Sequence, residues 1–178
     1  LMTLLTVLLV FLIGMVVLKI AERNLLHQKF VSGDLALMSL QSSLDTFWQG
    51  REKLVDCSVD FANLRMLVTQ TARNLGLLEM AILDRDMRVI VASKPTGGLD
   101  PEGNRAVSDA FAVGTIQRKI YGDPGAFGIG FYERMEFSGP LVIDREIVAV
   151  ARFSLSLRDV GESLQGTLRV LYLYTFLN

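Results

Sequence analysis

The sequence contains little of what most catalytic and metal sites require. Its 178 residues include one cysteine and one histidine, so no intrachain disulfide and no cysteine-based zinc site can form. A Ser–His–Asp triad could form only around His27, which closely follows an apolar segment on a predicted helix. The sequence also lacks a P-loop motif and a kinase signature. We therefore predict that this chain has no catalytic residue, no metal site and no cofactor.

An excess of charge of either sign is also missing. The 18 Lys and Arg residues are balanced by 19 Asp and Glu residues, which gives a formal net charge of -1. Nucleic-acid binding depends on a basic field that neutralises phosphates. The sequence therefore predicts that nucleic acid is not a partner.

A long apolar segment at the start of the chain accounts for much of its mean hydropathy of +0.38. Leu1–Leu18 contains no ionisable residue, and 18 residues of helix rise roughly 27 Å, close to the thickness of a bilayer core. A secretory signal peptide is the alternative, but its apolar core would be shorter and would end at a small-residue cleavage site. Lys19–Arg23 follows here without such a site. We predict a retained transmembrane helix over residues 1–20.

The other end of the chain is apolar as well. Leu168–Asn178 is too short to cross a bilayer, and an amphipathic helix docked on the core is one interpretation. Arg169, Tyr172 and Tyr174 are instead typical of a helix that enters lipid. We favour an exit helix over 158–178 that leads into a second transmembrane helix. Residues 21–157 then form one domain between two spans, and such a loop is most simply exported.

The predicted helix from Ile20 to Trp48 carries a seam of mostly apolar residues. The seam recurs at steps of four and three, as in a coiled coil: Leu26, Phe30, Gly33, Leu37, Leu40, Leu44 and Phe47. Gly33 lies between Ser32 and Asp34, a combination that can break or kink a helix. The seam could pack on its own domain or pair with the same helix of a second copy, and the sequence leaves both uses open.

The remaining pattern predicts the order α-α-β-β-α-β-β-β-α. The elements are helix Val59–Leu75, strands Met80–Leu83 and Val89–Ala92, helix Asn104–Ala112, and strands Thr115–Tyr121, Ile129–Phe137 and Ile147–Leu155, followed by the exit helix. The first two strands are apolar at successive positions, so this part of the sheet should be covered on both faces. The fold class is α+β, an antiparallel sheet with helices on one side.

Cationic and aromatic side chains on the later strands are the best candidates for a binding site. Alternation along the strands assigns Lys119 and Tyr121 to one face and Arg118 to the other. Arg152 interrupts an apolar face, and because a buried guanidinium is costly without a partner, it should meet a carboxylate of the protein or of a ligand. The alternative is cross-strand pairing, for example of Arg118 or Arg134 with Glu133 or Glu136.

Three stretches of the sequence resemble a known family of sensor domains. Ala81–Ser93, Gly139–Val150 and Phe153–Val160 resemble the first hairpin, the later hairpin and the exit strand of extracytoplasmic single Cache domains, also called PAS-like or PDC domains. The resemblance implies a PAS-like antiparallel sheet with a long membrane-proximal N-terminal helix, flanked by transmembrane helices. Met87 and Arg145 stand where the family usually has the turn glycine, which predicts other turn types or longer loops.

The resemblance also implies a function. The chain would be the signal-input region of a sensor histidine kinase in the bacterial inner membrane, with its central domain periplasmic and with the receptor a homodimer. A chemoreceptor, a diguanylate cyclase or a ligand-free dimerisation or partner-binding module are the alternatives. The expected ligand is a small molecule, an organic anion if the cationic residues face it. The predicted ligand-binding residues are Arg118, Tyr121, Tyr132, Arg134 and Arg152.

Overall fold

The computed structural model describes residues 2–48, 58–94, 101–123 and 131–177. The chain divides into two compact units. The first comprises Leu1–Val31, Tyr121–Arg134 and Leu157–Asn178, and the second comprises Ser32–Ile120 and Met135–Ser156.

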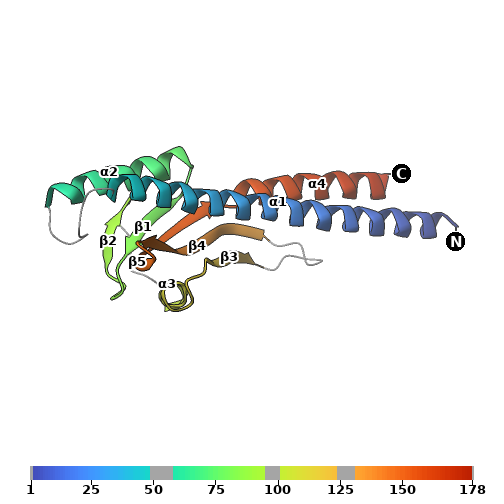
Figure 1. Cartoon of the computed structure of the whole chain (residues 1–178). Coiled ribbons are helices and arrows are strands. Elements are labelled where there is room, and N and C mark those ends of the chain that lie inside the picture. The colour runs from blue at the N-terminus through green and yellow to red at the C-terminus, as the bar shows by residue number, and fades with distance from the viewer. Residues whose placement is uncertain (1, 49–57, 95–100, 124–130, 178) are drawn as a thin grey trace. The chain divides into compact units, whose positions relative to one another are not determined.

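The element order matches the sequence prediction (Figure 1). The elements are α1 (Met2–Trp48), α2 (Ser58–Asn74), β1 (Glu79–Leu83), β2 (Val89–Ala92), α3 (Pro101–Val113), β3 (Gln117–Asp123), β4 (Phe131–Ile143), β5 (Glu146–Ser156) and α4 (Arg158–Leu177). The strands form one sheet in the order β2-β1-β5-β4-β3, and β1 pairs antiparallel with both β2 and β5. The predicted α+β class with an antiparallel sheet is therefore confirmed.

In the second unit, α1 covers one face of the sheet through the seam that the sequence predicts. Leu37, Leu40 and Leu44 are buried, and Gly33 lies against the ring of Phe137, which stacks on Phe153 with ring centroids 5.1 Å apart. This part of the seam packs on its own domain. The side chain of Phe47 lies outside the described residues. The helix predicted from Ile20 to Trp48 continues through Gly33 without the break that this residue could cause, and the missing Cβ leaves room for the Phe137 ring.

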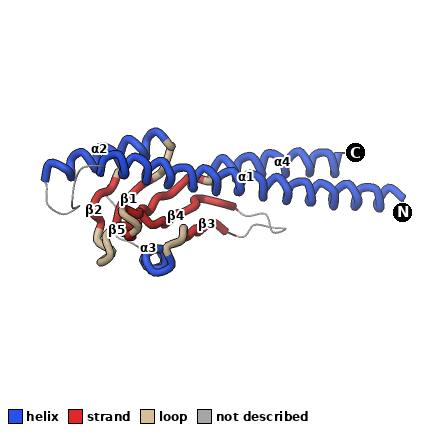
Figure 2. Tube along the Cα trace, in the orientation of Figure 1, coloured by secondary structure: helices blue, strands red, loops and turns tan. Residues whose placement is uncertain are grey.

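The opposite face of the sheet is covered by α3, so the helices do not all lie on one side. Val107 and Ala110 of α3 pack with Ala81, Leu83 and Val150 in one buried cluster. Figure 2 shows α3 on the side of the sheet away from α2. The apolar residues at successive positions of β1 are explained by this arrangement, and the predicted coverage of both faces is confirmed.

The two hairpin turns keep left-handed backbone conformations without glycine. Met87 has a φ of 61°, and Asp144 and Arg145, between β4 and β5, have φ values of 51° and 69°. The expectation of a longer loop at Arg145 is wrong, because β4 ends at Ile143 and β5 begins at Glu146. Two consecutive residues with positive φ are the geometry of a type I′ turn, which matches the twist of the flanking strands.

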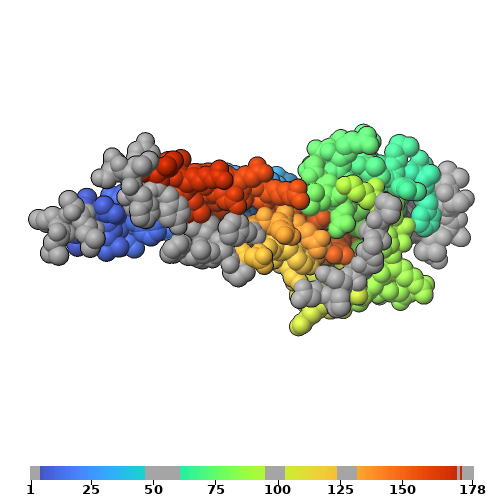
Figure 3. Space-filling model, turned by 180° about the vertical axis from the view of Figure 1, so that it is seen from behind, coloured from blue at the N-terminus to red at the C-terminus, as the bar shows by residue number. Residues whose placement is uncertain are grey.

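In the first unit, the N-terminal part of α1 and α4 lie side by side, and the two chain ends lie at the same end of this pair (Figures 1 and 3). Leu18 and Leu164 are buried, and a Cβ added at Gly14 would overlap Leu171. Helix α1 is, among the described residues, the one helix long and apolar enough to cross a membrane.

Candidate functional site

A buried ion pair stands at the centre of the second unit's sheet. The Arg152 guanidinium donates two hydrogen bonds to Oε1 of Glu136, and the distance from Nε is 3.1 Å. The two side chains are 14% and 4% exposed. The sequence-based expectation that Arg152 meets a carboxylate is therefore confirmed, and the carboxylate belongs to the protein.

The ion pair lies on the face of the sheet that α3 covers. Arg152 on β5 is the register partner of Ala81 on β1, and Val150 is the partner of Leu83. Directly opposed residues share a face, and Ala81, Leu83 and Val150 pack against α3. The charged pair thus continues an apolar layer, so its two groups are shielded from water by the sheet and its cover.

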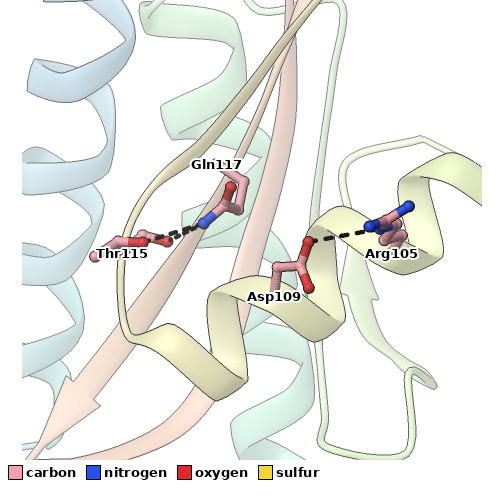
Figure 4. A network of polar contacts seen from close by, with 4 residues as sticks. All are labelled: Arg105, Asp109, Thr115 and Gln117. Atoms are coloured by element: carbon pink, nitrogen blue, oxygen red, sulfur yellow. Dashed lines mark hydrogen bonds and ion pairs between the residues drawn. The ribbon is translucent and has the colours of Figure 1, made fainter.

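Other polar groups of the second unit lie on the strands around this pair. Ser138 on β4 and Ser154 on β5 are buried, and Gln117 and Lys119 on β3 are half-buried. Figure 4 shows the Gln117 amide directed back to Thr115, with 3.1 Å between Nε2 and the threonine Oγ1. The same view shows Arg105 and Asp109 one turn apart on α3, 4.0 Å between their charged atoms.

Arg118 points to the other side of the sheet. Its Nη2 lies 2.8 Å from each carboxylate oxygen of Asp34 on α1. Asp34 was not among the partners that the sequence suggested for Arg118. The sequence offered no signal for Asp34, because 84 residues separate the partners.

In the first unit, a buried carboxylate follows the apolar part of α1. Glu22 is 2% exposed, accepts a hydrogen bond from the Tyr132 hydroxyl, and lies 2.5 Å from Nζ of Lys19. Tyr121 and Arg134, also in this unit, form a cation–π pair with the guanidinium carbon 4.4 Å from the ring centroid. Glu22 was not among the predicted residues, although the sequence carries a signal for it, an acidic residue on the seam face of α1 between Leu18 and Leu26.

An ion pair in the first unit links α1 to the start of α4. Nζ of Lys29 lies 2.7 Å from Oδ2 of Asp159. Partial burial raises the pKa of Asp159, but the hydrogen bond and the positive charge of Lys29, with backbone N–H groups at the helix start, outweigh it. The pKa of Asp159 is therefore lowered, and its carboxylate stays ionised at neutral pH.

The structure brings two of the five predicted site residues together, and each of the other three contacts an acidic residue. Tyr121 and Arg134 contact each other, Tyr132 contacts Glu22, Arg118 contacts Asp34, and Arg152 contacts Glu136. Within the described part of the chain, no group of His, Cys, Asp and Glu is arranged to hold a metal. A role in ligand binding stays a prediction for all five.

Two hollows in the second unit were not expected from the sequence. A groove of about 490 Å³ lies between α2 and the edge strand β2, and its lining includes Phe61, Arg65, Val89 and Lys94. A gap of about 10 Å³ lies under α1 and α2, lined by Leu44, Leu64 and other side chains. The groove is in the size range of small-molecule pockets, whereas the gap is at the lower limit for one water molecule.

Comparisons with known proteins give matches at the level of the fold. No protein-family model matches the sequence, and no curated protein matches it. The ligand-binding domain of the Campylobacter jejuni chemoreceptor Tlp3, in complex with L-norvaline, matches 88% of this chain with a TM-score of 0.60 and 13% identity. The ligand-binding domain of the Pseudomonas aeruginosa PAO1 amino acid chemoreceptor PctC, in complex with GABA, matches 86% with a TM-score of 0.51 and 20% identity.

The matched regions cover 61% of the Tlp3 chain and 67% of the PctC chain. The long N-terminal helix, the five-stranded antiparallel sheet and the C-terminal helix agree with the arrangement that the sequence resemblance implied. The chain has the fold of the extracytoplasmic Cache, or PAS-like, sensor domains of bacterial receptors.

Proposed function

We propose that this chain is the ligand-sensing input region of a bacterial transmembrane receptor, of the chemoreceptor kind rather than a histidine kinase. The support is the likeness to the Tlp3 and PctC ligand-binding domains, both of which come from chemoreceptors. Among the alternatives from the sequence, the chemoreceptor is the one that these likenesses favour.

The proposed receptor sits in the cytoplasmic membrane with its sensor outside. Residues 1–20 form the first transmembrane helix, 21–157 the sensor domain, and 158–178 the helix that leads back toward the membrane. The arrangement of the first unit supports this division, because α1 and α4 run side by side with both chain ends together. The apolar, mostly exposed start of α1 is suited to a lipid environment.

We propose that the ligand is a small molecule with a carboxylate and an ammonium group, as in an amino acid. The observation that carries this proposal is the buried Arg152–Glu136 pair on the α3 face. A guanidinium is suited to a carboxylate, and a carboxylate to an ammonium group, so a zwitterion can replace the internal pair with two matched contacts. L-norvaline and GABA, the molecules named for the Tlp3 and PctC structures, both carry these two groups.

The other predicted site residues differ in how readily they could contact such a ligand. Arg134 and Tyr121 offer a cation and an aromatic face. For Arg118 and Tyr132, ligand contact requires an exchange of partner, because Asp34 and Glu22 occupy their polar atoms. We therefore place Arg152 and Glu136 first, Arg134 and Tyr121 second, and Arg118 and Tyr132 last.

A thermal-shift screen of amino acids and organic acids on the purified protein tests the proposal. We expect an amino acid to raise the melting temperature of the wild type. Charge-assisted hydrogen bonds contribute about 1.5–3 kcal/mol each, so Arg152→Lys and Glu136→Gln should each weaken its binding by roughly 10- to 150-fold. Arg152→Lys keeps the positive charge beside Glu136 while it removes the planar fork that binds a carboxylate.

Arg105→Lys is the control, because it makes the same chemical change at an exposed arginine that pairs only within α3, with Asp109 one turn away. It should leave the affinity close to that of the wild type. If acids without an ammonium group stabilise the protein as well, the ligand is an organic anion and the proposed zwitterion is wrong. If no compound stabilises the wild type, the ligand-free dimerisation module takes the place of the sensor.

A further inference from the structure

The groove between α2 and β2 has an apolar side chain on each of its two walls. Phe61 on α2 and Val89 on β2 both line it, and they are 45% and 43% exposed. Val91, two residues further along β2, also lines the groove and is buried. Large apolar side chains that border a common hollow form a surface that the apolar part of a ligand can cover.

The room in this groove depends on a small residue of α2. Phe61, Ala62 and Arg65 all belong to the lining, and their spacing places them on one side of the helix. Leu64 and Val68 are buried, so they belong to the side of α2 that packs on the protein. Ala62 is exposed and its side chain ends at Cβ. A longer side chain at this position would therefore occupy part of the groove.

The charged groups of the described lining are all positive. Arg65 on α2 and Lys94 after β2 are both exposed, and no carboxylate residue lines the groove with them. Within the part of the chain that the structure describes, neither cation forms an ion pair. Nζ of Lys94 donates a hydrogen bond of 2.7 Å to the carbonyl oxygen of Leu78. This bond holds the ammonium group in place and leaves two of its three N–H groups for another acceptor.

This lining does not suit a zwitterion or an added strand. The ammonium group of an amino acid would meet two cations in the groove, whereas the Arg152–Glu136 pair offers one group of each sign. Strand β2 has 4 residues and an irregular ladder, so it offers few main-chain groups to an extended peptide. The lining instead complements a small molecule that combines an apolar body with a negative charge.

We propose that the α2–β2 groove is a second binding site, which takes a small organic anion with an apolar body, such as an aromatic carboxylate. The body lies between Phe61 and Val89, and the carboxylate faces Arg65 and Lys94. The Arg152–Glu136 pair lies on the face of the sheet that α3 covers, and α3 is on the side away from α2 (Figure 2). The two sites are therefore separate, and each can be occupied without the other.

Isothermal titration calorimetry with phenylacetate tests the groove. The full chain is used in lipid nanodiscs, and phenylacetamide is the comparison compound because it has a similar shape and no charge. We expect phenylacetate to bind, with an affinity that falls as salt is added, because exposed cations are screened. Phenylacetamide should bind about fivefold more weakly or not at all.

Three variants of the groove and one control locate the binding. Arg65→Gln and Lys94→Gln should each weaken phenylacetate binding by about threefold to fivefold, the range of exposed charge pairs. Ala62→Leu fills the groove without a change of charge and should weaken binding by about tenfold or more. Arg73→Gln is the control, because Arg73 lies in the last turn of the same helix, outside the lining, and it should leave the affinity unchanged.

No binding of phenylacetate to the wild type, equal binding of the two compounds, or equal losses in Arg65→Gln and Arg73→Gln would each overturn the proposal. Arg152→Lys separates this site from that of the proposed function. Phenylacetate binding should persist in that variant, and a loss there with none in Ala62→Leu would assign the acid to the buried pair and overturn the groove. An amino acid that stabilises the wild type should still stabilise Ala62→Leu, so each site can fail without the other.

Discussion

Arg145 and Met87 hold left-handed backbone conformations at the turns of the two hairpins. This conformation costs a residue with a Cβ roughly 1–2 kcal/mol, a cost that glycine avoids. The two residues differ in what their side chains do. Met87 packs against the cluster between the sheet and α3, whereas Arg145 is exposed. Packing therefore accounts for the strained residue at the first turn, Met87, but not for Arg145 at the second.

Arg145→Gly should therefore stabilise the protein, by up to about 1 kcal/mol after the greater freedom of glycine in the unfolded chain is counted. Met87→Gly should give no gain, because relief of the backbone is offset by the loss of a half-buried side chain. Urea unfolding of the two variants beside the wild type measures both effects. A loss of stability in Arg145→Gly would show that a contact of the guanidinium adds more to the free energy of unfolding than the backbone strain removes.

For single residues, the sequence predicted that a buried charged side chain requires a partner more reliably than it predicted which residue that partner is. Arg152 was expected to require a carboxylate because it interrupts an apolar stripe, and the structure supplies Glu136, 16 residues earlier. The acids that pair with Arg118 and Tyr132 lie 84 and 110 residues away on α1. Strand alternation describes neighbours within a sheet, whereas contacts to a packed helix depend on the tertiary arrangement.

At the scale of elements, the contact between α1 and the sheet depends on small residues. Gly33 and Gly139 are buried where a Cβ would overlap Phe137 and Leu37, respectively. Glycine is usually unfavourable inside a helix, so the sequence left a break or kink at Gly33 open within the predicted helix. The break is absent because the ring of Phe137 takes the place of the missing side chain.

Gly33→Ala should destabilise the protein by about 1–3 kcal/mol, although alanine is the better helix former. The added methyl group would force the Phe137 ring out of its stack on Phe153. Gly166→Ala in α4 is the control, since a Cβ there meets nothing within 4 Å and should stabilise by up to about 1 kcal/mol. Thermal unfolding compares the two, and the same sign of change in both would contradict the packing argument.

Element order was predictable from hydrophobic periodicity, and some element boundaries were not. Strand β4 continues past the predicted Phe137 to Ile143, through Gly139 and Pro140. Proline normally ends a strand because it cannot donate to the ladder. Since β3 has 7 residues and β4 has 13, part of β4 has no β3 residue beside it, and a proline costs least there.

At the scale of the whole molecule, the proposed topology places the start of α1 in the membrane, with the residue before Leu1 on the side away from the sensor. A reporter enzyme that needs oxidising conditions, inserted between Gly97 and Gly98, should be active in intact cells. The same reporter fused before Leu1 should be inactive. Activity of the reporter fused before Leu1, together with no activity of the reporter between Gly97 and Gly98, would contradict the extracytoplasmic sensor.

The fold class could be read from the sequence because each element has its own hydrophobic period and turn residues. The side of the sheet taken by α3 could not, because Val107 and Ala110 would serve on either face. The grouping of site residues was also beyond the sequence. Residues such as Tyr121 and Arg134 meet only when neighbouring strands take a particular register.

The strand order has a consequence for aggregation. The outer strands of the sheet are β2 and β3, and outer strands are templates for pairing with other chains. Strand β2 has only 4 residues, and its ladder with β1 is irregular between Ile82 and Leu83. Strand β3 carries Arg118, Lys119 and Asp123. A short irregular edge on one side and a charged edge on the other disfavour the growth of the sheet from one molecule into the next.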